Sequence, residues 1–298
     1  MSTLRRAIVI GASVCATSMS CLTGQDAFGA ALASDSAADA AYNSGWTTGS
    51  NGGTGFGPWD LKTQGNTNFN EFAGHFTASP SNGDLNEIAT SGRAWGTFAN
   101  DDNTTETRQI AGAFRDLTGG NLNNDGSQAI RVRVEHGIIL NTGSLSANVE
   151  GARTRGWVGV ILNPAPSWEP DPFDGFGSLA GAFAVGFTGG DANYGIHVPG
   201  GAPTFVSTNV PFGIGGHEIT ITQTSASTWK VDFLRLSDNQ FFSFTGNGAL
   251  GAINRVGLVN RNAELGDVYF NSLAVIPEPA TLGTLAAIAL VAMRRRSR

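Results

Sequence analysis

Apolar and polar residues alternate one by one in several segments, and this period of two constrains the fold more than any other feature. Residues 130–135 read Ile-Arg-Val-Arg-Val-Glu, with every second side chain apolar. Residues 217–222 and 229–233 repeat the pattern. Successive side chains of a strand point to opposite faces, so each segment turns one face to a core and one to water, as strands of antiparallel sheets do.

Other short segments rich in apolar and β-branched residues are further strand candidates. They are residues 93–99, 108–115, 157–162, 179–187, 240–245, 255–260 and 268–276. Glycine and asparagine clusters, such as residues 119–121 and 124–126, mark turns between them. Before the C-terminal tail no window predicts an amphipathic helix. The sequence therefore predicts an all-β domain, a two-sheet antiparallel sandwich of jelly-roll type, with an up-and-down barrel as the alternative.

The segment from Ser34 to Ile276 is acidic and free of cysteine. It carries 12 Lys and Arg against 22 Asp and Glu, a net charge of −10. Nucleic-acid binding depends on basic patches, so this charge argues against a nucleic-acid partner. Both cysteines, Cys15 and Cys21, precede the segment, which excludes a disulfide, a cysteine nucleophile and a thiolate metal site within it.

The N-terminus has the pattern of a signal peptide. Arg5 and Arg6 precede an apolar stretch from residue 7 to residue 14 that continues weakly to residue 22. Ala31-Leu32-Ala33 fits a small-x-small cleavage site, with the cut before Ser34, and Ala27-Phe28-Gly29 is a second candidate. Residues 1–33 are therefore predicted to be a signal peptide, and residues 34–275 the exported sandwich domain.

Residues 276–298 form a distinct C-terminal tail. Pro277-Glu278-Pro279 stands before an apolar run, residues 280–293, that would make a helix of roughly 21 Å. Counted from Ile276, the apolar stretch is near the lower length limit for crossing a bilayer. Proline disfavours helix, so the triplet should be extended and accessible to a protease. The run is followed by basic residues that favour the cytoplasmic side and would stop transfer: Arg294, Arg295, Arg296 and Arg298.

This order of Pro-Glu-Pro, apolar run and arginine cluster resembles the PEP-CTERM sorting signal of Gram-negative bacteria, over residues 275–298. The resemblance implies use of the export machinery and transient anchoring in the inner membrane. It also implies cleavage near Pro277, Glu278 and Pro279 by an exosortase-type membrane protease. The protein would then reach the cell surface or extracellular matrix, in association with exopolysaccharide. The same tail occurs on many unrelated domains, so it implies no activity.

Three further segments resemble parts of an extracellular β-sandwich module found on PEP-CTERM proteins. Residues 42–59 resemble its opening motif and residues 255–273 its closing motif, and residues 189–194 resemble its middle. The module is similar in outline to concanavalin-like sandwiches, which is the fold that the resemblance implies, and it brings no known activity. From the residues themselves, Trp46, Phe56 and Trp59 are predicted to form a first strand and its aromatic packing.

Acidic loops are the candidate metal sites. Glu169, Asp171 and Asp174 echo the Glu-x-Asp-x-x-Glu strand of sandwich-fold glucanases, but Pro170 and Pro172 break the segment, which favours an exposed loop. A structural calcium is the better use for hard oxygen ligands of this kind. The candidate ligands are Asp101, Asp102, Asp125, Asp171 and Asp174. The four histidines lack the spacing of a zinc site.

Trp168 is the candidate ligand contact. It lies between Pro166 and Pro170 in a polar segment, whereas the other tryptophans are predicted to be core residues.

The leading functional hypothesis is an exported, non-enzymatic matrix protein that binds extracellular polysaccharide. The alternative is a glycoside hydrolase or polysaccharide lyase on the same sandwich, which needs two carboxylates about 5–10 Å apart in a groove. Glu135, Glu218 and Asp232 are the candidates, because each alternates with core residues. A third hypothesis is cell adhesion through protein contact, which would require an exposed apolar patch.

Overall fold

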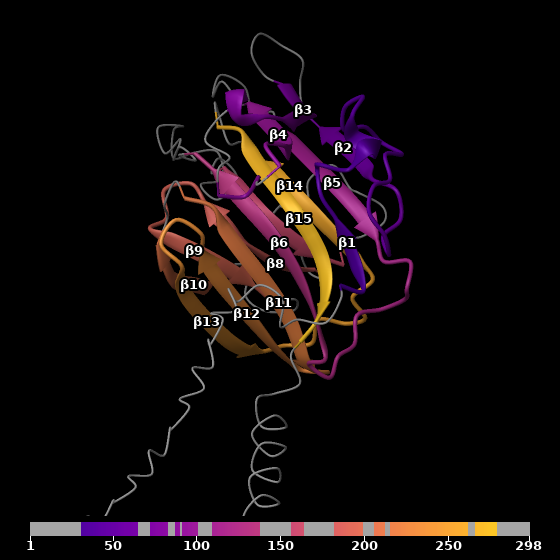
Figure 1. The fold of residues 1–298 in the computed structure, drawn as a ribbon. Coiled ribbons are helices and arrows are strands. Elements are labelled where there is room, and N and C mark those ends of the chain that lie inside the picture. The colour runs from indigo at the N-terminus through magenta and orange to yellow at the C-terminus, as the bar shows by residue number, and fades with distance from the viewer. Residues whose placement is uncertain are drawn as a thin grey trace, which may run out of the picture.

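The computed structural model describes residues 31–64, 72–82, 87–89, 91–100, 109–137, 156–163, 182–198, 206–211, 215–261 and 266–278. They form two antiparallel sheets packed face to face, which confirms the predicted all-β sandwich (Figure 1). Within these ranges the helical elements are the short 3-10 turns η1 (Ala40–Tyr42) and η2 (Pro80–Asn82). No helix of this part of the chain has the length and apolar character needed to cross a membrane.

The eight-stranded sheet has the order β13-β12-β11-β6-β15-β4-β3, and β1 pairs with β15 next to the segment that pairs with β4. Its strands are β1 (Ala33–Asp35), β3 (Phe72–Ala78), β4 (Ala94–Asn100), β6 (Gln128–His136), β11 (His217–Ser225), β12 (Thr228–Arg235), β13 (Gln240–Asn247) and β15 (Val268–Pro277). In Figure 1, β3 and β4 lie at the upper end and the turn joining β11 to β12 at the lower end.

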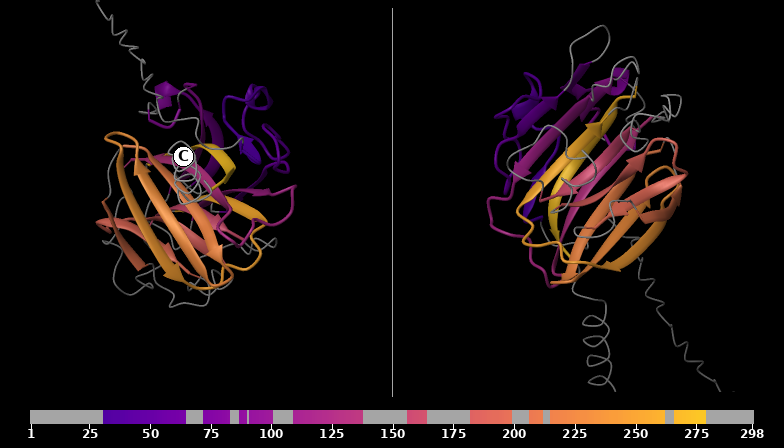
Figure 2. Two further views of the ribbon diagram at one scale, coloured as in Figure 1. Left: turned by 60° about the horizontal axis from the view of Figure 1, so that its bottom comes forward. Right: turned by 180° about the vertical axis from the view of Figure 1, so that it is seen from behind.

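The seven-stranded sheet has the order β10-β9-β8-β7-β14-β5-β2. Its strands are β2 (Asp60–Gln64), β5 (Ile110–Asp116), β7 (Trp157–Leu162), β8 (Phe183–Thr188), β9 (Asn193–His197), β10 (Val206–Pro211) and β14 (Arg255–Arg261). The last two strands of the described residues, β14 and β15, therefore belong to different sheets and run through the middle of the molecule (Figure 2).

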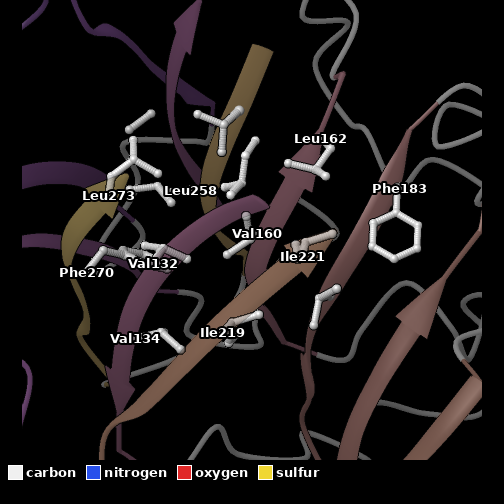
Figure 3. Packing of buried hydrophobic residues seen from close by; sticks show 14 of the residues in the cluster. Val132, Val134, Val160, Leu162, Phe183, Ile219, Ile221, Leu258, Phe270 and Leu273 are labelled. Carbon is white, nitrogen blue, oxygen red and sulfur yellow. The ribbon is translucent and has the colours of Figure 1, made fainter. Parts of the chain in front are cut away.

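The core lies between the two sheets (Figure 3). The eight-stranded sheet contributes the apolar members of its alternating strands, such as Val132, Ile219 and Ile221, while Val160 and Leu258 come from the other sheet. Their polar neighbours face outward, so the period of two read from the sequence is the inside–outside pattern of this sheet.

The inner strands of the seven-stranded sheet, β5, β7, β8, β9 and β14, are buried on both faces, which explains why they do not alternate. The edge strands β2 and β10 are partly exposed. All six residues of β7 are buried. On its outward side a second apolar cluster contains Ile110, Phe114, Trp157, Ile161, Ala182, Ala184 and Val259. A strand covered on both faces has no position that needs a polar side chain, so it reads as a continuous apolar run.

Residues 42–59 do not form the predicted first strand, although their aromatic packing is confirmed. The segment makes turns and the isolated bridges Ser34↔Thr54 and Phe56↔Leu117. The ring centroids of Trp46 and Trp59 lie 5.2 Å apart, and both rings are buried. Glycine breaks the extended conformation here, because Gly53 has a φ of +70° and a side chain there would meet the Ser34 carbonyl oxygen at 1.9 Å.

Both predicted domain boundaries fall within strands. β1 begins at Ala33, one residue before the predicted cleavage site, and the Leu32 amide donates to the Val275 carbonyl at 2.8 Å. β15 continues through Ile276 and Pro277, and the Glu278 amide donates to the Ser127 carbonyl at 2.9 Å. The sandwich therefore reaches into both segments that the sequence assigns to sorting.

Candidate functional site

Three phenylalanines form an aromatic strip on the outward face of the eight-stranded sheet, at its β3 edge. Phe72 and Phe76 come from β3 and Phe98 from β4. The Phe72 and Phe98 ring centroids are 5.6 Å apart, and those of Phe76 and Phe98 are 6.1 Å apart. Phe72 is 48% exposed and the other two are partly buried. We call these three residues the aromatic strip.

Two glycines determine how the rings of the strip lie. Gly74 is opposite Phe98 in the β3–β4 register, and Gly96 is opposite Phe76. A Cβ at Gly74 would meet the Phe98 ring at 2.4 Å, and a Cβ at Gly96 would meet the Phe76 ring at 2.4 Å. Each ring therefore lies across the backbone of the neighbouring strand, an arrangement that stabilises a glycine at a sheet edge. The opposite side of each ring is turned away from the sheet.

One unsatisfied polar group lies beside the strip. Asn100 is opposite Phe72 in the register, so its side chain lies on the same outward face. Its side-chain oxygen is buried and has no hydrogen-bond partner among the described residues. An acceptor of this kind next to one exposed and two partly buried aromatic rings suits a ligand that combines apolar faces with hydroxyl donors.

The residues of the aromatic strip were not among the site residues predicted from the sequence. Phe72, Gly74 and Phe76 alternate on β3 and Gly96 and Phe98 on β4, and this pairing of glycine with phenylalanine was the available signal.

On β6, β11 and β12 the outward face carries ion-paired polar side chains. Arg133 Nε donates to a Glu218 carboxylate oxygen at 2.9 Å. Lys230 Nζ lies 2.8 Å from the Asp232 carboxylate, which also accepts from the Ser243 hydroxyl at 2.6 Å. These carboxylates are partly buried and engaged by cations, so the face is polar and structurally ordered.

Of the three candidate catalytic carboxylates, Glu218 and Asp232 face outward as predicted, and Glu135 does not face water. Glu135 is only 5% exposed and lies opposite Tyr269 in the β6–β15 register. Tyr269 belongs to a small apolar cluster with Ala78, Ile88, Ala89 and Ala94, which covers this part of the outward face. A connection folded over the sheet thus buries a position that strand alternation alone places in solvent.

Asp125 is the predicted calcium ligand that the structure describes. Its carboxylate accepts from the Ser127 amide at 2.9 Å and from the Ser127 hydroxyl at 2.5 Å, which lowers the pKa of Asp125. The group therefore caps a turn. Among the described residues no group of three or more His, Cys, Asp or Glu side chains lies together. The other candidate ligands and Trp168 lie outside the described residues, as do Pro279 and the C-terminal arginines.

The four histidines lie on strands β3, β6, β9 and β11. His136 and His217 meet Tyr194 between the sheets. His136 Nδ1 donates to the Gly137 carbonyl at 2.9 Å, so its Nε2 accepts from the Tyr194 hydroxyl at 2.7 Å. The Tyr194 hydroxyl in turn lies 3.4 Å from His217 Nδ1. Burial lowers the pKa of both histidines to about 4, so both are neutral at pH 7.

A cleft of about 370 Å³ lies between β1 and the β5–β6 connection, at the lower end of the sandwich. Its apolar lining includes Leu32, Leu117 and Leu122, and its polar lining includes Asn121 and Gln128. No Asp, Glu, His or Cys lines it, so the described lining offers the Thr118 hydroxyl but no carboxylate, imidazole or thiol.

No protein-family model matches this chain, and no curated protein matches it. Among solved structures, it is similar to lectin II from Ulex europaeus, at 13% identity over 83% of this chain and 98% of that one, with a TM-score of 0.41. It is also similar to a carbohydrate esterase of the Shiga toxin-encoding bacteriophage phi24B, at 15% identity over 74% and 90% of the two chains, with a TM-score of 0.40. The T. cruzi calreticulin globular domain matches at 11% identity over 78% and 95%, with a TM-score of 0.42. Likenesses this distant carry no information about the activity of this chain.

Proposed function

We propose that this chain is an exported, non-enzymatic protein of the cell envelope whose sandwich binds extracellular polysaccharide through the aromatic strip. The observation that carries the proposal is the geometry of Phe72, Phe76 and Phe98, whose rings lie over backbone glycines on an outward face. Sugar rings present flat faces of C–H groups, which pack on aromatic rings, and their hydroxyls supply donors for an acceptor such as Asn100.

The export part of the proposal rests on the sequence at both ends. A signal peptide pattern at the N-terminus and a tail that resembles the PEP-CTERM signal at the C-terminus fit a protein that crosses the inner membrane and is anchored there until an exosortase-type protease releases it. A domain of β-strands without cysteine is compatible with an oxidising or a reducing compartment. Its negative charge disfavours nucleic acid as a partner.

The non-enzymatic part rests on the state of the outward carboxylates. A glycosidase needs one carboxyl group that keeps its proton and a second that stays ionised and available. Glu218 is held by Arg133, and Asp232 is held by Lys230 and Ser243. A carboxylate held by such contacts is not free to serve as a general acid or as a nucleophile.

The test is binding to polysaccharides of the producing bacterium, measured by affinity electrophoresis with Phe72→Ala and Phe98→Ala. We expect each substitution to weaken binding by about two- to tenfold, because an aromatic contact contributes on the order of 0.5–1.5 kcal/mol. Phe241→Ala is the matched control: Phe241 is 61% exposed but lies on β13, at the opposite edge of the same sheet.

Two outcomes would contradict the proposal. Binding that survives both strip substitutions, or that falls equally with Phe241→Ala, would remove the strip as the site. Release of reducing ends or unsaturated sugars by the unmodified protein, lost in Glu218→Gln or Asp232→Asn, would replace binding by catalysis.

A further inference from the structure

The C-terminal end of β15 is fixed to the sandwich up to Glu278. Pro277 pairs with Gln128 of β6, and the Glu278 amide donates to the Ser127 carbonyl at 2.9 Å. The Glu278 carboxylate accepts from the Thr222 hydroxyl at 3.0 Å and lies 3.9 Å from Lys230 Nζ. The chain therefore does not leave the domain at the start of the predicted tail but at its third residue.

Very little chain remains between this fixed point and the apolar run. The run begins at residue 280, two residues after Glu278. Two extended residues span at most about 7 Å. If the run is in a bilayer, the part of the sandwich that holds Glu278 must lie within about one headgroup layer of the hydrocarbon.

The N-terminal connection enters at the same end. β1 is antiparallel to β15, with Ala33 opposite Val275, so Leu32 lies beside the last residues of β15. Leu32 is 53% exposed at this position. The first described residues and the last described residues of the chain thus lie at one end of the sandwich.

Two turns form this end, residues 123–127 before β6 and residues 224–228 between β11 and β12, and we call them the lower tip. Gly126 connects them, since its amide donates to the Gln223 carbonyl at 3.0 Å. Their side chains are mostly hydroxyls and amides, and pairs of hydroxyls such as Thr224 and Thr228 lie 2.7 Å apart. The tip contains one charged residue, Asp125, and no Lys or Arg.

We propose that the lower tip is a membrane-facing surface, held against the uncharged, hydrogen-bonding part of the lipid headgroup layer while the chain is anchored. This inference rests on the proposed function, because it requires the tail to span the membrane. The absence of a basic cluster in the tip means that the contact comes from the tether, since attraction to anionic lipids needs several Lys or Arg.

The same geometry places the aromatic strip away from the membrane. Phe72 of the strip lies opposite Asn100, at the C-terminal end of β4. This end of β4 lies near Val268, the first residue of β15, and therefore far from Pro277 at the other end of that strand. The anchored protein would therefore present its proposed ligand-binding edge outward.

The experiment uses the full chain, with Cys15 and Cys21 replaced by serine, reconstituted in phosphatidylcholine vesicles that contain a headgroup-nitroxide lipid. A bimane label is attached at Ser227→Cys or at Ser237→Cys. Both serines are exposed and they flank β12, whose eight residues separate them by about 26 Å. We expect nitroxide quenching to be at least twofold stronger at position 227 than at position 237.

A second variant tests the tether. Twelve Gly and Ser residues inserted between Glu278 and Pro279 should abolish the difference between the two labels, because the domain can then move away from the bilayer. Circular dichroism of each variant checks that the sandwich is folded.

The outcomes separate the inference from the proposed function. Equal quenching at both positions in a chain that floats with the vesicles would overturn the membrane-facing tip and leave the anchored tail in place. A folded chain that does not float with the vesicles would overturn both.

Discussion

At the scale of single residues, a buried ion pair fixes the irregular N-terminal segment to the sandwich. Arg115 of β5 pairs with Asp35 of β1, and both side chains are fully buried. Arg115 also donates to the Gly57 carbonyl at 2.6 Å and to the Asn51 side chain at 2.6 Å. The Tyr42 hydroxyl donates to Asp35 and accepts from Trp59 Nε1 at 2.9 Å. This one network therefore holds a segment that has almost no strand of its own.

We expect Asp35→Asn to lower the free energy of unfolding by about 3–5 kcal/mol, because it leaves the Arg115 charge buried without its partner. Asp60→Asn is the matched control, since Asp60 pairs with Arg255 at 3.0 Å but is 36% exposed, and such pairs contribute about 0–1 kcal/mol. Urea unfolding measures both. Equal losses for the two variants would show that the buried pair has no special role.

At the scale of elements, the position of β1 distinguishes between the two candidate cleavage sites of the signal peptide. Ala33 is 4% exposed, and its side chain fills the space beside Gly55, where a Cβ would meet it at 2.5 Å. Cleavage before Ser34 would remove Ala33 together with Leu32 and their pairing with Val275. Cleavage after Gly29 would keep the strand complete.

We therefore predict that the exported protein begins at Ala30, which N-terminal sequencing or intact mass can determine. Gly29→Leu should accumulate uncut precursor, because the residue before the cleaved bond must be small. Material that begins at Ser34 would show that the first residue of β1 is dispensable for export.

At the scale of the whole molecule, buried neutral histidines connect the two sheets. His75 of β3 donates from Nε2 to the Gly112 carbonyl of β5 at 3.0 Å, and His136 and His217 contact Tyr194 of β9. Burial lowers the pKa of all three to about 4. At His217 the neighbouring His136 and then Arg235 add to this effect, while Asp238 opposes it. In the folded sandwich these three histidines therefore stay neutral at pH values at which the unfolded chain would protonate them.

The folded pKa values lie below the ordinary histidine value of about 6.5, so the unfolded state takes up protons first as the pH falls. Stability should be complete above pH 6.5 and decline between pH 6.5 and pH 4, by on the order of 3 kcal/mol for His136 alone. Urea unfolding at each pH measures this. His136→Gln should flatten the decline, and an unchanged profile in that variant would assign the decline to other groups.

The sequence by itself determined an all-β domain of antiparallel sheet, because the eight-stranded sheet has one face in water and its strands must alternate. The structure decided in favour of the predicted sandwich over the barrel. The sequence also located strands such as β6, β7 and β12 closely, since their apolar residues and flanking turns are local signals. It did not reveal β1 or the short strand β9, whose pairing depends on partners far along the chain.

Only the tertiary structure decided the sites. It placed Phe72 and Phe76 beside Phe98 over two glycines, buried Glu135 under a connection, and fixed Glu278 to Thr222. Each of these depends on which strands become neighbours, and cross-strand register is a property of the packed sheets that no local pattern contains.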